Sequence, residues 1–189
     1  MKNRKYILAS GSPRRKELMS GLDLDFTVET GTDCDESFDE NMNLELVPEY
    51  LSSRKSDAFR RELKEDEVLI TADTMVLCEN KIMGKPQDRD EAFQMLKSLS
   101  GRTHKVLTGV TIRNRNDRKS FTATTLVTFR ELEDEEILYF IDRYRPYDKA
   151  GAYAVQEWIG YIGITGIDGS FYNVMGLPVQ MLYDELKKL

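Results

Sequence analysis

The stretch Tyr6 to Leu18, YILASGSPRRKEL, constrains the fold most, because a short apolar run leads through small residues to two adjacent arginines. The apolar run predicts a buried strand, and the small residues after it leave the backbone open to a ligand. Ser12 suits the N-cap of a helix that begins at Pro13 and stops at Gly21. The stretch therefore predicts a strand, a loop and the N-terminus of a helix.

A helix N-terminus behind such a loop can hold an anion, because free N–H groups and the positive end of the helix dipole face the loop. Arg14 and Arg15 add two positive charges, and one guanidinium group can bind two phosphate oxygens in a bidentate way. A well-capped surface helix with two solvated arginines is the alternative, and local chemistry alone leaves both open. Neither a Walker loop nor a hydrolase nucleophile elbow follows the strand.

Length and composition fit one domain or two closely packed lobes, since 40% of the 189 residues are apolar. The two cysteines, Cys34 and Cys78, are interpreted as free thiols, and the single histidine, His104, excludes a histidine-rich metal site. A net charge of −6 argues against general nucleic-acid binding, so a phosphate ligand needs local basic residues. Without a long apolar run or a signal-peptide pattern, we expect a cytoplasmic protein.

An acidic loop, Asp33 to Glu36, follows a strand predicted from Leu24 to Glu29. Such a loop is often only solvated. Alternatively it binds magnesium, which takes one or two carboxylates and completes its shell with water and substrate phosphates.

The next apolar stripe predicts a helix from Val47 to about Leu63. Arg54 and Lys55 fall in or beside this stripe, so a cation there snorkels, pairs with an acid or contacts a ligand. Periodicity does not choose between the two residues.

Asp73 interrupts the apolar strand predicted from Val68 to Leu77. An unpaired carboxylate in a buried strand is costly unless it is neutralised, hydrogen-bonded or bound to a metal. Either a structural ion pair or a functional base or metal ligand explains it. Lys85, between Gly84 and Pro86, follows shortly afterwards and is a candidate for substrate contact or a simple loop lysine.

The remaining pattern alternates helices and strands. It predicts helices at Asp88 to Leu99, Asp134 to Tyr144 and Val179 to Leu189, a hairpin of strands around 106–112 and 121–129, a strand from Tyr161 to Thr165 and a loop from Gly169 to Pro178. His104 shares the parity of the inward residues of the hairpin, which favours a packed histidine over a catalytic one.

Five motifs together resemble the Maf family of nucleoside triphosphate pyrophosphatases, over nearly the whole chain. They are LASGSPRR (Leu8 to Arg15), TADT (Thr71 to Thr74), GKP (Gly84 to Pro86), DKAGAYAVQ (Asp148 to Gln156) and DGSFYNVMGLP (Asp168 to Pro178). The resemblance implies a Maf/ITPase-like α/β fold over residues 1–189 as a single domain: an elongated mixed sheet flanked by helices, with two lobes and a substrate cleft between them. It also implies hydrolysis of a nucleoside triphosphate to the monophosphate and pyrophosphate with a divalent metal cation, Mg²⁺ or Mn²⁺, as in nucleotide-pool cleansing.

The resemblance also implies roles for individual residues. Asp73 is similar to the proton acceptor, and Glu36 together with Asp73 to the metal-side acids. Ser10, Arg14, Arg15, Lys55 and Lys85 match the phosphate-contacting positions. Arg14, Thr74 and Gln156 match the positions that accompany dTTP and UTP specificity, and a glutamine can both donate to a carbonyl and accept from an imide N–H.

Other functions stay open at this point. A pyrophosphatase for 7-methyl-GTP or another modified nucleotide is one alternative, and a septum-formation regulator that acts by binding is another. The expected partner is the nucleoside triphosphate, with neither nucleic acid nor membrane involved, and a homodimer is left open.

Overall fold

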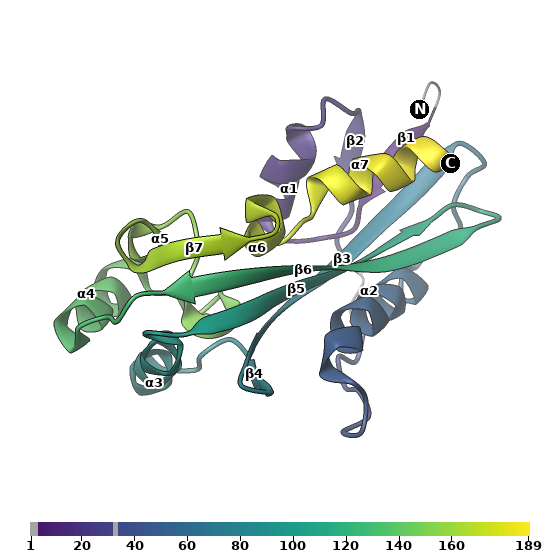
Figure 1. Cartoon of the computed structure of the whole chain (residues 1–189). Coiled ribbons are helices and arrows are strands. Elements are labelled where there is room, and N and C mark those ends of the chain that lie inside the picture. Colours follow the sequence, from purple (N-terminus) through teal and green to yellow (C-terminus); the bar gives the residue numbers. More distant parts are fainter. Residues whose placement is uncertain (1–3, 32–33) are drawn as a thin grey trace. The chain divides into compact units, whose positions relative to one another are not determined.

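Over residues 4–31 and 34–189, which the computed structural model describes, the chain forms a mixed sheet of seven strands flanked by helices (Figure 1). The strands are β1 Lys5–Leu8, β2 Phe26–Val28, β3 Glu67–Cys78, β4 Lys81–Met83, β5 Thr103–Arg113, β6 Arg118–Phe129 and β7 Ile164–Asp168. Their order is β2-β1-β3-β5-β6-β7, and β4 pairs with β3. The α/β class and the mixed, helix-flanked sheet predicted from the sequence are confirmed.

The helices are α1 Pro13–Ser20, α2 Val47–Asp57, α3 Arg89–Leu99, α4 Asp134–Tyr144, α5 Trp158–Gly163, α6 Phe171–Met175 and α7 Val179–Lys188, with short 3₁₀ turns η1 Leu44–Leu46 and η2 Ala150–Ala152. None of the helices in the described ranges combines the length and the apolar character needed to cross a membrane. The chain forms two compact units, each with its own core. Unit 1 holds the residues up to Thr74 together with 108–123 and 176–189, and unit 2 holds 75–107 and 124–175.

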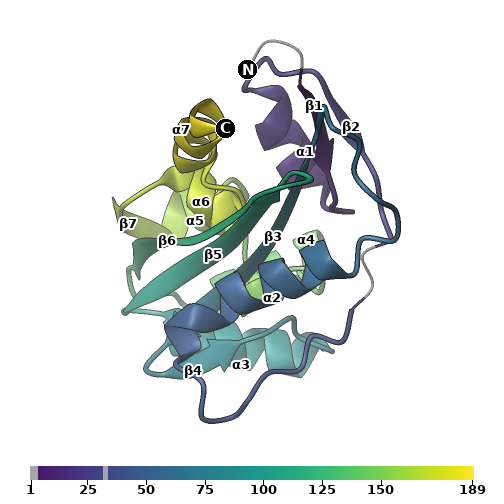
Figure 2. The same cartoon turned by 90° about the vertical axis from the view of Figure 1, so that its right-hand side faces the viewer.

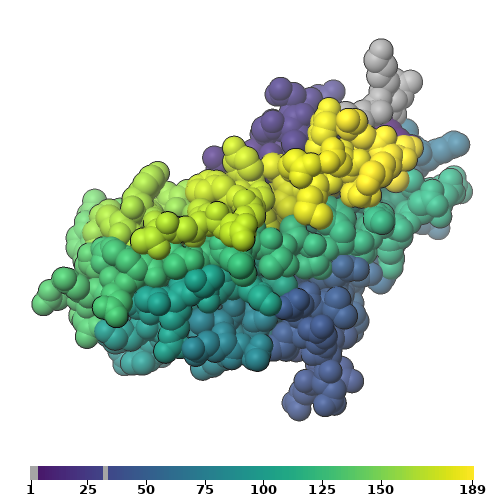
Figure 3. Space-filling view, in the orientation of Figure 1, coloured from purple at the N-terminus to yellow at the C-terminus, as the bar shows by residue number. Residues whose placement is uncertain are grey.

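Unit 1 is built on parallel strands. β1 pairs in parallel with β2 on one side and with β3 on the other, with Leu8 opposite Ile70. The apolar residues of β1 are buried, as expected for a parallel strand that is covered on both faces. Helix α2 covers one face of these strands, and α1 and α7 lie on the other (Figures 1 to 3). A Cβ at Gly109 of β5 would lie 2.1 Å from the backbone of Pro48, so glycine allows α2 to pack directly on the sheet.

Unit 2 has an apolar core built from helices and strands. Helices α3 and α4 contribute fully buried side chains such as Leu96 and Phe140, and β6 contributes Phe129. β4 pairs antiparallel with β3 across a tight turn in which Glu79 and Asn80 have positive φ. The buried position of His104 in this core confirms the prediction that it is a packed histidine.

Most predicted elements are confirmed, and the helix of the opening stretch is the clearest case. Helix α1 begins at Pro13, the Ser12 hydroxyl caps it by accepting from the Arg15 N–H, and Gly21 ends it. The expected helix at Asp134 to Tyr144 also has the predicted bounds.

Three local predictions are wrong. Helix α2 ends at Asp57 rather than near Leu63, because the chain turns away and the Arg61 guanidinium binds Glu29 and Glu67, at 2.7 and 2.6 Å. The predicted apolar stripe holds within the helix, where Val47 and Leu51 are buried.

The second error concerns residues 161–165, which begin in helix α5 and reach β7 only at Ile164. Two glycines allow this helix to pack closely on its neighbours. A Cβ at Gly160 would lie 2.0 Å from the Val155 carbonyl oxygen, and one at Gly163 would lie 2.9 Å from the Phe129 ring. A short helix, α6, also interrupts the predicted loop from Gly169 to Pro178.

Candidate active site

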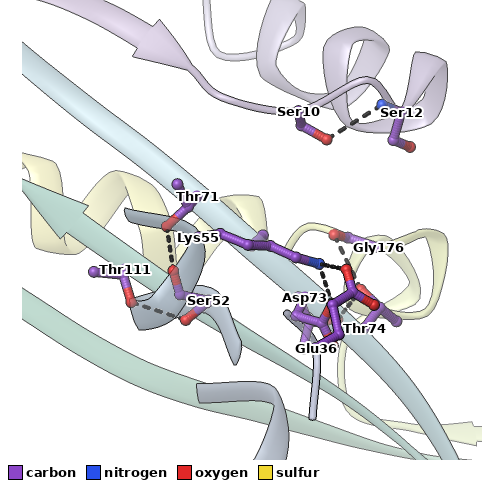
Figure 4. A network of polar contacts seen from close by, with 12 residues as sticks. Ser10, Ser12, Glu36, Ser52, Lys55, Thr71, Asp73, Thr74, Thr111 and Gly176 are labelled. Atoms are coloured by element: carbon purple, nitrogen blue, oxygen red, sulfur yellow. Dashed lines mark hydrogen bonds and ion pairs between the residues drawn. The ribbon is translucent and has the colours of Figure 1, made fainter. Parts of the chain in front are cut away.

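Asp73 lies in β3 with its side chain on the face that α2 covers. Side chains alternate along a strand, so Thr71 and Asp73 point to the same face. The Thr71 hydroxyl donates to the Ser52 carbonyl at 2.7 Å, and the Lys55 ammonium donates to Asp73 Oδ1 at 2.5 Å (Figure 4). The carboxylate that the sequence places in an apolar strand therefore has a charged partner, as its burial requires.

Lys55 bridges two carboxylates. Its Nζ lies 2.5 Å from Asp73 Oδ1 and 2.9 Å from Glu36 Oε1. The side chains of Lys55 and Asp73 are 16% and 15% exposed, whereas that of Glu36 is 61% exposed, so the cluster opens to solvent on the Glu36 side. Burial disfavours the charged lysine, but Asp73 and Glu36 outweigh it and raise the pKa of Lys55 above its ordinary value.

Arg54, the other cation left open by the periodicity, points elsewhere. Its guanidinium donates to the Tyr50 hydroxyl at 3.1 Å and lies over the same ring. Of the two cations, it is Lys55 that contacts Asp73.

Glu36 and Asp73 are arranged in a way that suits a hard cation. An oxygen of each carboxylate points to the same position, and the Lys55 ammonium occupies that position. Within residues 4–31 and 34–189 no group of three or more histidine, cysteine, aspartate or glutamate side chains converges as a metal site. Two carboxylates match magnesium, which takes its remaining ligands from water and substrate phosphates. Asp33 of the acidic loop lies outside the described residues.

Arg15 occupies the other face of β3. Its Nε donates to the Gly176 carbonyl at 2.8 Å, its Nη1 to the Ala72 carbonyl at 2.8 Å, and its Nη2 to the Thr74 hydroxyl at 3.0 Å. A longer contact of 3.5 Å joins Nη1 to Ser10 Oγ. Burial lowers the pKa of Arg15, and the nearby Asp73 carboxylate opposes that effect without cancelling it. The guanidinium thus contacts residues on both sides of Asp73.

The loop between β1 and α1 stays close to β3. The Ala9 N–H donates to the Ile70 carbonyl at 2.9 Å, after which Ser10 Oγ accepts from the Ser12 N–H at 3.2 Å (Figure 4). A Cβ at Gly11 would meet only a methyl group of Thr30, at 4.0 Å, so the loop backbone is open there. Arg14 is half-buried at the start of α1. The predicted arrangement of loop and helix N-terminus is confirmed, while its use for phosphate stays a prediction.

Two predicted site residues belong to unit 2. Lys85 is exposed in the loop after β4, and the carbonyl of its neighbour Gly84 accepts from the Gly151 N–H at 3.0 Å. This bond joins the GKP motif to the small-residue segment that leads to Gln156. The amide oxygen Oε1 of Gln156 is buried, and no residue in the described part of the chain offers it a hydrogen bond. Such an oxygen is costly to leave unpaired, and an N–H group of a ligand would satisfy it.

Lys149 anchors the same segment. Its side chain is only 9% exposed, and its ammonium lies 2.7 Å from Asp148 and 3.3 Å from Glu157. Lys149 therefore links Asp148, which precedes Gln156 in the sequence, to Glu157, which follows it.

Sequence reasoning missed Thr108 and Gly176. The two hydroxyls of Thr74 and Thr108 lie 3.0 Å apart, and the Gly176 carbonyl accepts from both Arg15 and Thr74. A buried threonine facing another strand and a glycine in a loop were the available signals, but neither indicates a partner. Of the predicted residues, Glu36, Lys55 and Asp73 form one direct cluster, and Ser10, Arg15 and Thr74 form another.

Comparison with known proteins gives consistent results. The family model "Maf-like protein" matches residues 5–189. A dTTP/UTP pyrophosphatase from Bacteroides thetaiotaomicron is 56% identical over 97% of this chain and 95% of its own length, and one from Porphyromonas gingivalis is 53% identical over 99% and 95%. The solved structure of a HAM1 protein from Coxiella burnetii has a TM-score of 0.54 at 13% identity, covers 98% of this chain and 100% of its own, and shares the fold. With a family match along almost its full length and relatives at more than half identity, the chain belongs to the Maf family.

Proposed function

We propose that this protein is a nucleoside triphosphate pyrophosphatase that hydrolyses dTTP and UTP to the nucleoside monophosphate and pyrophosphate. The observation that carries the proposal is the Glu36–Lys55–Asp73 cluster, which presents a partly buried carboxylate beside a second acid and a cation. The names of the relatives at 53–56% identity support the same reaction and substrates. The reaction uses a cytoplasmic nucleotide pool and needs no nucleic acid.

In the proposed reaction, Asp73 orients a water molecule and accepts its proton. The water oxygen bonds to the α-phosphorus, the bond from that phosphorus to the bridging oxygen breaks, and pyrophosphate leaves. Glu36 and Asp73 would hold a divalent cation, Mg²⁺ or Mn²⁺, which supplies positive charge for the leaving group. Ser10, Arg14, Lys55 and Lys85 contact the phosphate oxygens, where fixed donors and cations stabilise the charge that develops.

Gln156 is the proposed reader of the base. Uracil and thymine offer carbonyl oxygens beside an imide N–H, and the unpaired Oε1 of Gln156 suits that N–H. A site built on such bonds rejects a base that leaves its polar groups unpaired. The resemblance to the Maf family implies an acid at this position in the subgroup that acts on 7-methyl-GTP, which argues against that alternative.

A substrate panel with Mg²⁺ and Mn²⁺ tests the reaction. We expect higher kcat/KM for dTTP and UTP than for ATP, GTP and 7-methyl-GTP. Hydrolysis in ¹⁸O-labelled water should place the label in the nucleoside monophosphate, because attack occurs at the α-phosphorus. Orthophosphate as the primary product, or label in pyrophosphate, would contradict the mechanism.

Gln156→Glu tests the specificity assignment separately. A carboxylate only accepts hydrogen bonds, so the variant should lose part of its preference for dTTP and UTP. Gln94→Glu, at an exposed position of α3, is the matched control and should keep the preference of the wild type. If Gln156→Glu keeps it too, Gln156 does not read the base.

A further inference from the structure

We propose that Arg15 is a positioning residue that holds β3 in place on both sides of Asp73, and that its guanidinium serves the strand instead of a substrate phosphate. The inference rests on the proposed role of Asp73 in hydrolysis. It departs from the role that the family resemblance implies for Arg15.

The first argument concerns the edge of β3. The carbonyls of Ile70 and Ala72 point to the same edge of the strand, because the direction of the carbonyls alternates along it. Strand β1 supplies the donor for Ile70 through the Ala9 N–H, at 2.9 Å, and the chain then turns into the loop. At Ala72 the donor is Arg15 Nη1, which lies 2.8 Å from the carbonyl oxygen. The guanidinium thus continues the hydrogen-bond ladder past the end of β1 and satisfies a carbonyl that would otherwise lose its partner.

The second argument concerns the residue after Asp73. Arg15 Nη2 donates to the Thr74 hydroxyl at 3.0 Å, while Nε donates to the Gly176 carbonyl at 2.8 Å. The neighbours of Asp73 on both sides are therefore held by one rigid, planar group. The loop at Gly176, just before α7, is fastened to the same group.

The third argument concerns the donors that are left. The guanidinium has five N–H donors, and four of them donate to Gly176, Ala72, Ser10 and Thr74, so bidentate binding of a phosphate would require breaking at least one of these bonds. Asp73 acts from the opposite face of the strand, where it contacts Lys55. A strand shift of about 1 Å at such a residue lowers turnover by about 10²-fold.

Arg15→Lys tests the proposal, because lysine keeps the charge but cannot bond in three fixed directions. We expect kcat for dTTP to fall by about 10²-fold while KM changes less than about threefold. The matched variant Arg14→Lys, at the neighbouring proposed phosphate contact, should act mainly on KM. A rise in KM with wild-type kcat in Arg15→Lys would show that Arg15 binds substrate and would overturn the proposal.

Gly176→Ala approaches the same bonds without changing any charge. Gly176 has φ +116°, which is unfavourable for alanine, although the added Cβ would meet Thr74 and Arg15 only at 3.6 and 3.7 Å. The carbonyl should turn away from Arg15, and kcat should fall at least tenfold with little change in KM. Gly101→Ala, at another glycine with positive φ, is the control and should keep wild-type kcat. Wild-type kcat in a folded Gly176→Ala would contradict the proposal.

Amide hydrogen exchange separates this inference from the proposed function. In Arg15→Lys, exchange should become faster at Asp73, Thr74 and Leu177 and stay unchanged at the core of unit 2. Exchange does not depend on turnover, so it reports on the strand even if Asp73→Asn proves fully active and the proposed function fails. Unchanged exchange at all three amides would show that Arg15 does not hold the strand.

Discussion

Two short polar contacts in this protein differ in their exposure to solvent and in their charge. Lys55 Nζ lies 2.5 Å from Asp73 Oδ1, and His104 Nε2 lies 2.7 Å from the Tyr153 hydroxyl. The first pair keeps about a sixth of each side chain exposed, at 16% and 15%, whereas His104 and Tyr153 are 1% and 5% exposed.

Charged partners decide the charge of Lys55, and burial decides that of His104 and Tyr153. Lys55 is held between two carboxylates, which keep its pKa above the ordinary value, so the lysine is charged at neutral pH. Burial instead lowers the pKa of His104 to about 4 and raises that of Tyr153, so both are neutral. The Phe129 ring packs against both of them, with centroids 5.8 and 5.1 Å away. The Lys55–Asp73 pair, called the open pair below, can exchange protons and meet a charged substrate. The His104–Tyr153 pair, called the sealed pair, can only stabilise the core.

Asp73→Asn should have the largest effect on turnover. The amide keeps the shape but neither accepts the proton from water nor offers a charged metal ligand, so kcat should fall by about 10² to 10⁴. Steady-state kinetics with dTTP and a thermal melt measure activity and folding together. Asp57→Asn, which changes an exposed carboxylate paired with Arg118, is the control and should keep wild-type kcat. Near-wild-type kcat in Asp73→Asn would remove Asp73 from the chemistry.

Lys55→Met should follow, with a fall in kcat of about 10², because loss of one fixed electrostatic group at a reacting centre has that magnitude. The raised pKa means that Lys55 stays charged below its ordinary pKa of ~10.4, so its contribution to stability is complete there and is lost as pH rises through the folded-state pKa. The difference in unfolding free energy between wild type and Lys55→Met should therefore stay constant at neutral pH and shrink in strong alkali.

Arg54→Met is the matched control for Lys55, since it removes the adjacent cation that contacts Tyr50. It should keep kcat within about twofold of wild type. A larger loss in Arg54→Met than in Lys55→Met would contradict the role given to Lys55.

Elements with local signals could be predicted from the sequence, and elements that depend on distant partners could not. The bounds of α1 follow from Ser12, Pro13 and Gly21, because a cap, a first-turn proline and a terminal glycine act within a few residues. The end of α2 depends on Arg61, whose partner Glu29 is distant in sequence. No local pattern contains that information.

The candidate site shows the same division. The cost of a buried carboxylate singles out Asp73, but periodicity could not tell Lys55 from Arg54, and only the family resemblance chose between them. The contacts of Arg15 with Ala72, Thr74 and Gly176 join segments far apart in the chain. Residue type alone could not separate an anion site from these contacts, because a guanidinium can donate to phosphates and to backbone carbonyls.

The sealed pair should make stability sensitive to acid. The unfolded chain protonates His104 near its ordinary pKa of 6.5 and the folded chain only near 4, so between these values the unfolded state binds more protons. The contribution is present above pH 6.5 and is lost as pH falls toward 4, by about 3 kcal/mol in total. Urea unfolding of wild type and His104→Gln across this range measures it, since the carboxylates are common to both. Parallel curves for the two proteins would contradict the buried, neutral histidine.

Tyr153→Phe should have the smallest effect of these variants, and it tests the comparison through the His104–Tyr153 pair. Removing the hydroxyl leaves a buried ring nitrogen of His104 without its partner, so the unfolding free energy should fall by about 1 to 3 kcal/mol. Tyr144→Phe, whose ring stacks on Phe140, is the control and should change it by less than about 0.5 kcal/mol. In both variants kcat should stay within about twofold of wild type, because a neutral, sealed pair has no proton to exchange with substrate. If Tyr153→Phe lowered kcat as far as Lys55→Met while remaining folded, the two contacts would not differ in function as their burial implies.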